Sequence, residues 1–192
     1  MTIAWYGETC LAIEGESGTL LINPSSNLKR PKGPVDILIF TEALPPKADL
    51  PVRQAGWERL LGPQTVVIEN PGEYDVHGFF ILVFDAFAVI QESGRTLAHL
   101  ARYSSELSAA QIERLGTVQI LALKINKNAD EAIRVVNQIE PAVVIPMYSG
   151  SSIEEFLKEF GAAKTEPQKK IVLRKNQAPL NEETEVVVLQ AP

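Results

Sequence analysis

The sequence predicts an α/β sandwich, in which two β-sheets pack together and are covered by helices. The first half of the chain reads as short apolar strands separated by glycine-containing turns. The second half alternates helices with strands. No repeat, low-complexity tract or long linker divides the 192 residues, so we expect one domain spanning residues 1–192.

The strands of the first half are short runs of apolar and β-branched residues. Glycines such as Gly15, Gly18, Gly78 and Gly94 supply the turns between them. The predicted strands are Thr2–Tyr6, Cys10–Glu14, Thr19–Ile22, Asp36–Phe40, Thr65–Ile68, Phe79–Phe84, Phe87–Gln91 and Thr96–Leu100.

The helices of the second half carry start and stop signals. Ser108 and Gln111 form a capping box at the start of the first helix, and Gly116 and Gly161 follow two helix ends. The predicted helices are Ser108–Leu115, Asp130–Ile139 and Ser152–Phe160, and the strands are Val118–Leu123, Ala142–Met147, Lys170–Arg174 and Glu185–Leu189.

The charge and composition of the chain disfavour several classes of protein. With 18 Lys plus Arg against 24 Asp plus Glu, the net charge of -6 works against binding to nucleic acid. No apolar run approaches the roughly 18 to 20 residues of a membrane span, and the N-terminus carries no secretory signal. The single cysteine, Cys10, fits a reducing compartment. We therefore expect a cytoplasmic protein with no membrane segment.

Several segments together resemble the metallo-β-lactamase-fold hydrolases, in their UlaG-like small bacterial branch. The likeness covers nearly the whole chain, and it implies a single αββα sandwich domain. The segments are WYGETCLAIEG, GTLLINP, VDILIFTEALPP, VIENPGEYDVHGFFI, GRTLAHLARYSSELSAAQIERLGTVQILAL and NQIEPAVVIPMYSG.

The ligand positions that the resemblance implies have all changed. That family usually has Gly-His-Ser-Cys, Ile-Asp-Pro, Thr-His-x-His-x-Asp-His, a Gly-Asp pair and Pro-Met-His, which hold divalent metal ions. Leucine and proline cannot coordinate a metal, and lysine and arginine repel a cation. The residues at the former metal-site positions are Glu8, Glu42, Leu44, Pro46, Lys47, Arg102 and Tyr148, with Asn23 and Ala101 replacing two accompanying family residues. The resemblance thus implies a site with no metal, no cofactor and no inherited catalytic residue.

Three other groups of residues could carry chemistry. Glu73, Asp75 and His77 would share one face of a strand and could bind a metal, although this segment reads as a turn entering a strand. His99, at the end of a predicted strand, reads either as a hydrogen-bonded core imidazole or as one that supports the site without being a ligand. Cys10 could act as a nucleophile with His77 or His99, but buried packing is the favoured interpretation.

Three hypotheses about function remain open. The leading one is a catalytically inactive protein with a binding or scaffold role, whose partner is an unidentified protein or small molecule. The second is a hydrolase of a small anionic substrate with a rebuilt metal-free site that uses Glu8, Glu42, Arg102 and Tyr148. The third is a metal-dependent hydrolase whose ligands are not among the matched positions.

The resemblance also predicts how the former site is arranged. The loops after Phe40 and after Met147 should open at the same edge of the sandwich. Arg102 should pair with Glu8 or Glu42 in place of the metal, with Lys47 as a competing cation. Leu44 and Tyr148 should fill the volume that the ions and water would occupy.

Overall fold

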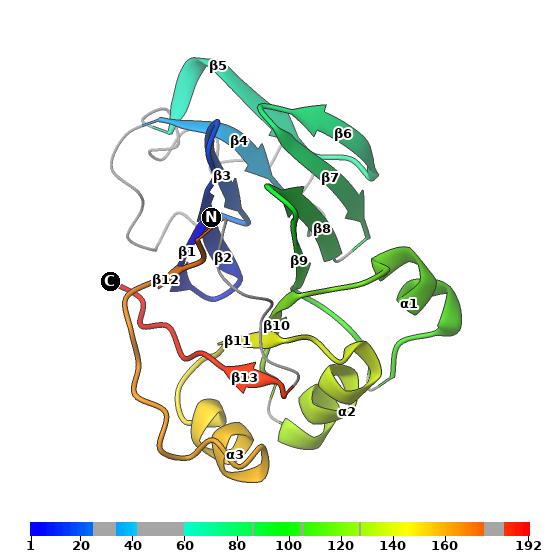
Figure 1. Cartoon of the computed structure of the whole chain (residues 1–192), viewed down its shortest axis with the longest axis vertical. Coiled ribbons are helices and arrows are strands. Elements are labelled where there is room, and N and C mark those ends of the chain that lie inside the picture. Colours follow the sequence, from blue (N-terminus) through cyan, green and yellow to red (C-terminus); the bar gives the residue numbers. More distant parts are fainter. Residues whose placement is uncertain (25–33, 42–59, 86, 105, 127, 175–182) are drawn as a thin grey trace, which may run out of the picture.

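A computed structural model describes residues 1–24, 34–41, 60–85, 87–104, 106–126, 128–174 and 183–192. It contains two mixed β-sheets that pack against each other as the layers of an αββα sandwich (Figure 1). In spatial order, the first sheet comprises β12 (Ile171–Val172), β1 (Thr2–Gly7), β2 (Cys10–Glu14), β3 (Thr19–Ile22), β4 (Val35–Ile39) and β5 (Leu61–Ile68). The second comprises β13 (Glu185–Val186), β11 (Val143–Met147), β10 (Ile120–Lys124), β9 (Arg95–Leu100), β8 (Phe87–Glu92), β7 (Phe79–Phe84) and β6 (Gly72–Val76).

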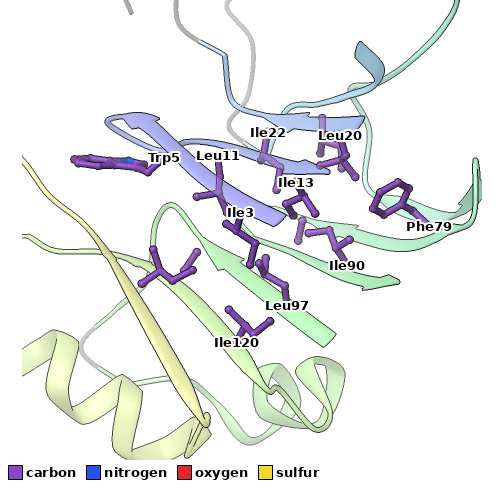
Figure 2. Packing of buried hydrophobic residues seen from close by; sticks show 14 of the residues in the cluster. Ile3, Trp5, Leu11, Ile13, Leu20, Ile22, Phe79, Ile90, Leu97 and Ile120 are labelled. Atoms are coloured by element: carbon purple, nitrogen blue, oxygen red, sulfur yellow. The ribbon is translucent and has the colours of Figure 1, made fainter. Parts of the chain in front are cut away.

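The core between the sheets follows from the alternation of apolar residues along each strand. Ile3 and Trp5 on β1 face the same side as Leu11 and Ile13 on β2, because residues two apart share a face. Figure 2 shows Ile3 beside Leu97 and Ile13 near Ile90, both from the second sheet. The two sheets therefore share one apolar layer, as the fold prediction requires.

The helices cover the outer face of the second sheet. They are α1 (Ala109–Leu115), α2 (Ala129–Ile139) and α3 (Ser152–Glu159), and in Figure 1 α2 and α3 lie beyond β10 and β11, away from β1 to β3. Val135 of α2 and Phe156 of α3 are buried in one cluster with Leu121 and Val144 of the sheet. The predicted capping box is confirmed, since Ser108 and Gln111 bond reciprocally at the start of α1.

Most predicted strands are present, with four differences. Residues 72–76, expected as a turn, form strand β6, because Tyr74 and Val76 pack against the core while β6 pairs with β7. Strand β5 begins at Leu61 rather than Thr65. The two last strands are shorter than predicted, since each forms a ladder of only two residues at the edge of its sheet.

Parallel strands bring several chain turns to one edge of the sandwich. Strands β9, β10 and β11 run parallel to one another, as do β3, β4 and β5 in the other sheet. Segments that leave the carboxyl ends of such strands gather at that edge, where α/β proteins commonly bind ligands. No helix within the described ranges is long and apolar enough to cross a membrane.

Candidate functional site

The turn between β1 and β2 carries Glu8, the first of the former metal-site positions. Gly7 and Glu8 have φ angles of 101° and 48°, so the turn uses the left-handed region in which glycine costs least. The Trp5 indole N–H donates to the Glu8 carbonyl oxygen at 2.9 Å and holds the turn against the core. The Glu8 side chain is exposed as a result.

Asn23 joins three segments of the first sheet at the same edge. Its amide oxygen accepts from the Thr41 backbone N–H at 2.9 Å, and its amide nitrogen donates to the hydroxyl oxygens of Thr41 at 2.8 Å and Thr9 at 3.4 Å. Thr9 and Thr41 are both buried. Asn23 itself has φ 46°, a conformation that asparagine tolerates better than most residues. A neutral side chain thus cross-links the ends of β3 and β4 with the turn before β2.

His99 connects this network to the second sheet. Its Nε2 lies 2.8 Å from the Thr9 carbonyl oxygen and, because a carbonyl only accepts, Nε2 carries the proton of the neutral ring. Burial lowers the pKa of His99 to about 4. The histidine is a core residue as predicted, although its buried Nδ1 finds no hydrogen-bond partner in the part of the chain that the structure describes.

The ends of β9 and β10 place two cations near this edge. Arg102, which follows β9, is exposed. Lys124, the last residue of β10, is half-buried. The Tyr103 hydroxyl donates to the Lys124 carbonyl oxygen at 2.6 Å, and the Ile125 N–H donates to the Met147 carbonyl oxygen at 2.7 Å, which fixes the backbone on both sides of the lysine.

The sequence interpretation missed Lys124. Ile120 and Ala122 belong to the core between the sheets, and Lys124 continues their alternation onto the same face. The sequence does contain a signal for this residue. Lys124 is a charged residue at the carboxyl end of a buried strand, at a position whose side chain faces the core.

Tyr148, predicted to stand in place of a metal-binding histidine, follows directly after β11. Its ring packs on that of Trp5 with centroids 4.7 Å apart and planes tilted by 37°. Its hydroxyl donates to the Leu189 carbonyl oxygen at 3.3 Å, and burial raises its pKa. The tyrosine therefore directs its polar end toward the C-terminal segment of the chain.

A cavity of about 370 Å³ remains beside these residues. Its described lining is Glu8, Thr9, Lys124, Ile125, Met147, Tyr148 and Ser149. Tyr148 lines this cavity with its ring on Trp5 and its hydroxyl bonded to Leu189. That Tyr148 and Leu44 together fill the former pocket stays a prediction, because Leu44 lies outside the described residues. The cavity also brings the turn at Glu8 together with the segment after Met147.

The chain leaves Phe40 and Met147 at the same edge of the sandwich, as expected, although the loop that continues from Thr41 lies outside the described residues. Thr41, which follows the strand end at Phe40, bonds to Asn23, and Asn23 bonds to Thr9 in the cavity wall. Among the described residues, Arg102 and Glu8 form no ion pair. Pairing of Arg102 with Glu42 stays a prediction, because Glu42 lies outside the described residues, as do Leu44, Pro46 and Lys47.

The described lining does not fit a divalent metal ion. Such ions take several imidazole, thiolate or carboxylate ligands that converge on one point. The cavity offers one carboxylate, Glu8, together with the ammonium group of Lys124. The part of the chain that the structure describes contains no group of three or more His, Cys, Asp or Glu side chains placed to hold a metal.

The other candidate residues lie away from this cavity. Glu73 and Asp75 are exposed on β6, and His77 sits in the turn after it with φ 50°. Cys10 is buried with Leu21 in a cluster on the opposite face of the first sheet from the shared core. Neither group provides the arrangement that its catalytic or metal-binding hypothesis requires.

The comparisons with known proteins agree with this fold. Residues 2–148 match the sequence profile described as the beta-lactamase superfamily domain. The crystal structure of a protein from Thermotoga maritima, described as a candidate Zn-dependent hydrolase of the metallo-β-lactamase superfamily, is 25% identical with a TM-score of 0.77. The alignment covers 98% of this chain and 98% of that one.

More distant structures share the fold alone. A metallo hydrolase from the archaeon Ignicoccus hospitalis is 16% identical with a TM-score of 0.56, and the alignment covers 90% of this chain and 99% of that one. An isothiocyanate hydrolase from Delia radicum gut bacteria is 11% identical with a TM-score of 0.61, at the same two coverages of 90% and 99%. No curated protein matches the chain significantly.

Proposed function

Because this chain belongs to the β-lactamase superfamily, and because each ligand position matched in its sequence has changed, we propose that it is a catalytically inactive member with a binding or scaffold role. Its placement in the UlaG-like branch is part of the proposal and rests on the order of the sequence motifs. The similar structures described as metallohydrolases share the fold of this chain. The chemistry of the site residues instead supports a role without metal-dependent hydrolysis.

The observation that carries the proposal is the donor set around the cavity. A hydrolase of this fold would need metal ligands at the strand ends, where this chain has Arg102, Lys124 and Tyr148. Guanidinium and ammonium groups raise the local positive potential and disfavour a nearby cation. The Asn23 network supports the proposal too, because it joins the strand ends with neutral groups and needs no ion to do so.

Metal analysis of the untagged protein tests this proposal. The protein is purified without added metal, incubated with zinc, manganese or iron, dialysed, and its metal content is measured by mass spectrometry. We expect much less than one ion per chain. The Glu8→Gln variant is the control, since it removes the carboxylate of the described cavity lining, and metal that it retains is bound elsewhere. One chelator-sensitive ion per chain that is lost in this variant would overturn the proposal.

A hydrolase with a rebuilt, metal-free site is the second candidate. The open cavity favours it, since Glu8 and Tyr148 both line the space and a carboxylate there could act as a base toward a small anionic substrate. Release of p-nitrophenolate from p-nitrophenyl phosphate or p-nitrophenyl acetate tests it. A rate in the presence of chelator that the Glu8→Gln variant abolishes would favour this candidate, and equal rates for both proteins would count against it.

A further inference from the structure

The cavity at the strand ends is bordered by charged groups that have no partner among the described residues. Neither the Lys124 ammonium group nor the Glu8 carboxylate makes a hydrogen bond or ion pair there. Both side chains line the same space of about 370 Å³. This volume is at the lower end of the range of roughly 300 to 1,000 Å³ that small-molecule sites occupy.

Lys124 is held in a position that suits the binding of an anion. Its backbone is fixed by the bonds from Tyr103 and between Ile125 and Met147, so the side chain starts from a rigid strand end. The residue is half-buried and follows the inward register of β10. An ammonium group that has lost part of its water and has no partner among the described residues gains from an anionic ligand, because attraction between charges is stronger where water is partly excluded.

The surroundings of Lys124 add to the positive potential at this edge. Arg102 follows β9, the strand next to β10, and its guanidinium group has no partner within the described ranges. Helices α2 and α3 both begin shortly after the parallel strands β10 and β11 end, so their partly positive N-termini lie on this side of the sheet. These features would help Lys124 to bind an anion. The main support for anion binding is that Lys124 lines the cavity.

Glu8 restricts the ligand further. A simple anion in this cavity would be repelled by the Glu8 carboxylate unless a hydrogen-bond donor lay between them. Thr9 and Ser149 add polar side chains to the lining, and Ile125 and Met147 add apolar contacts. The lining therefore matches a molecule with an anionic group at one end and a hydroxyl or amino group at the other.

We propose that this cavity binds a small organic anion, with its carboxylate or phosphate group on Lys124 and a hydroxyl or amino group on Glu8. The proposal rests on the proposed metal-free function of the site and names the class of its ligand. Carboxylate and phosphate share the chemistry that Lys124 recognises, and probes of both kinds separate them.

Calorimetric titration in the presence of EDTA tests the proposal. The probes are glycolate and glycerol 3-phosphate, with glycerol as the uncharged control and acetate as the anion that lacks a donor group. We expect at least one of the first two to bind more tightly than acetate and glycerol. Lys124→Gln should weaken that binding by at least about tenfold, equivalent to about 1.4 kcal/mol. Glu8→Gln should reduce the preference for glycolate over acetate.

Lys169→Gln is the matched control, because it removes the same charge from an exposed lysine beside a separate groove with Ala4 and Pro192. It should bind the probes as the unchanged protein does. Equal weakening by both lysine variants, or no binding of either anion, would overturn the proposal. Binding that occurs without EDTA and disappears with it would mean that a metal holds the anion, so the proposed metal-free function would fail instead.

Discussion

Two corners at the edge of the sandwich where the parallel strands end differ in how their polar groups are used. The first-sheet corner, formed by Thr9, Asn23 and Thr41, is closed by hydrogen bonds between neutral groups. The second-sheet corner, formed by Lys124, Tyr148 and Ser149, borders a cavity of about 370 Å³. The Lys124 ammonium group in that corner has no partner among the described residues.

The difference teaches that polar groups at neighbouring strand ends can serve either the stability of the fold or the binding of a ligand. A neutral amide that bonds to buried hydroxyls stabilises a strand end at low desolvation cost. A cation beside a cavity that has no partner in the described part of the chain contributes little to folding but is available to a ligand. We therefore expect substitutions in the first-sheet corner to change stability, and substitutions in the second-sheet corner to change binding.

The largest expected effect is at Asn23. Asn23→Ala leaves the buried Thr41 N–H without its acceptor and places alanine in the left-handed region, so it should destabilise the protein by about 2 to 4 kcal/mol. Urea unfolding measures this loss. Asn23→Gly is the control, since it loses the same hydrogen bonds without the backbone strain and should cost less. A loss below about 1 kcal/mol in Asn23→Ala would show that the corner does not depend on the amide.

The next largest effect is a pH dependence of the stability of the protein, caused by His99. This residue of the second sheet bonds to the Thr9 carbonyl oxygen in the first-sheet corner. Its pKa is about 4 in the folded protein and about 6.5 when unfolded, so the unfolded state binds more protons between these values. Stability should fall as the pH drops from about 6.5 to about 4, by up to about 3 kcal/mol. Unfolding free energies measured across this window should show a flatter profile for His99→Gln than for the unchanged protein.

His77→Gln provides the comparison for that experiment. It leaves His99 and its bond to the Thr9 carbonyl oxygen in place, so the fall in stability should persist. If His99→Gln and His77→Gln have the same profile, the buried imidazole is not the source of the pH dependence.

A smaller effect is expected at Tyr148, which belongs to the second-sheet corner but directs its hydroxyl away from the cavity. Tyr148→Phe removes the bond to the Leu189 carbonyl oxygen and keeps the ring on Trp5, so it should cost about 0.5 to 1 kcal/mol in urea unfolding. Tyr74→Phe is matched to it, because it removes an exposed hydroxyl bond to Asn70 and should cost less. The opposite ranking would contradict the assignment of a structural role to the Tyr148 hydroxyl.

The smallest expected change in stability is at Lys124. Lys124→Gln removes a charge that has no partner among the described residues, so the free energy of unfolding should change by no more than about 0.5 kcal/mol. The same variant should lose anion binding in the titration described above. A loss of stability above about 1 kcal/mol would make Lys124 a structural residue and remove the contrast between the two corners.

Much of the fold could be predicted because local sequence patterns determine where its strands and helices form. The alternation in Thr2–Tyr6 and Cys10–Glu14 assigns each side chain to a face, and the capping box at Ser108 marks a helix start. The segment of residues 72–76 was missed as a strand, because its glycine and exposed carboxylates are typical of turns. Only pairing with β7 and packing of Tyr74 on the core make it a strand.

For the site, the sequence by itself determined which chemical groups stand at the positions of Glu8, Arg102 and Tyr148, and it predicts that they replace the family's ligands. Only the tertiary structure decided what those groups do. It turned the Tyr148 hydroxyl to Leu189, left Arg102 exposed and brought Lys124 to the wall of a cavity. The physical reason is that residue type and periodicity fix the face on which a side chain lies, whereas its partners depend on which strand ends meet once the two sheets have packed.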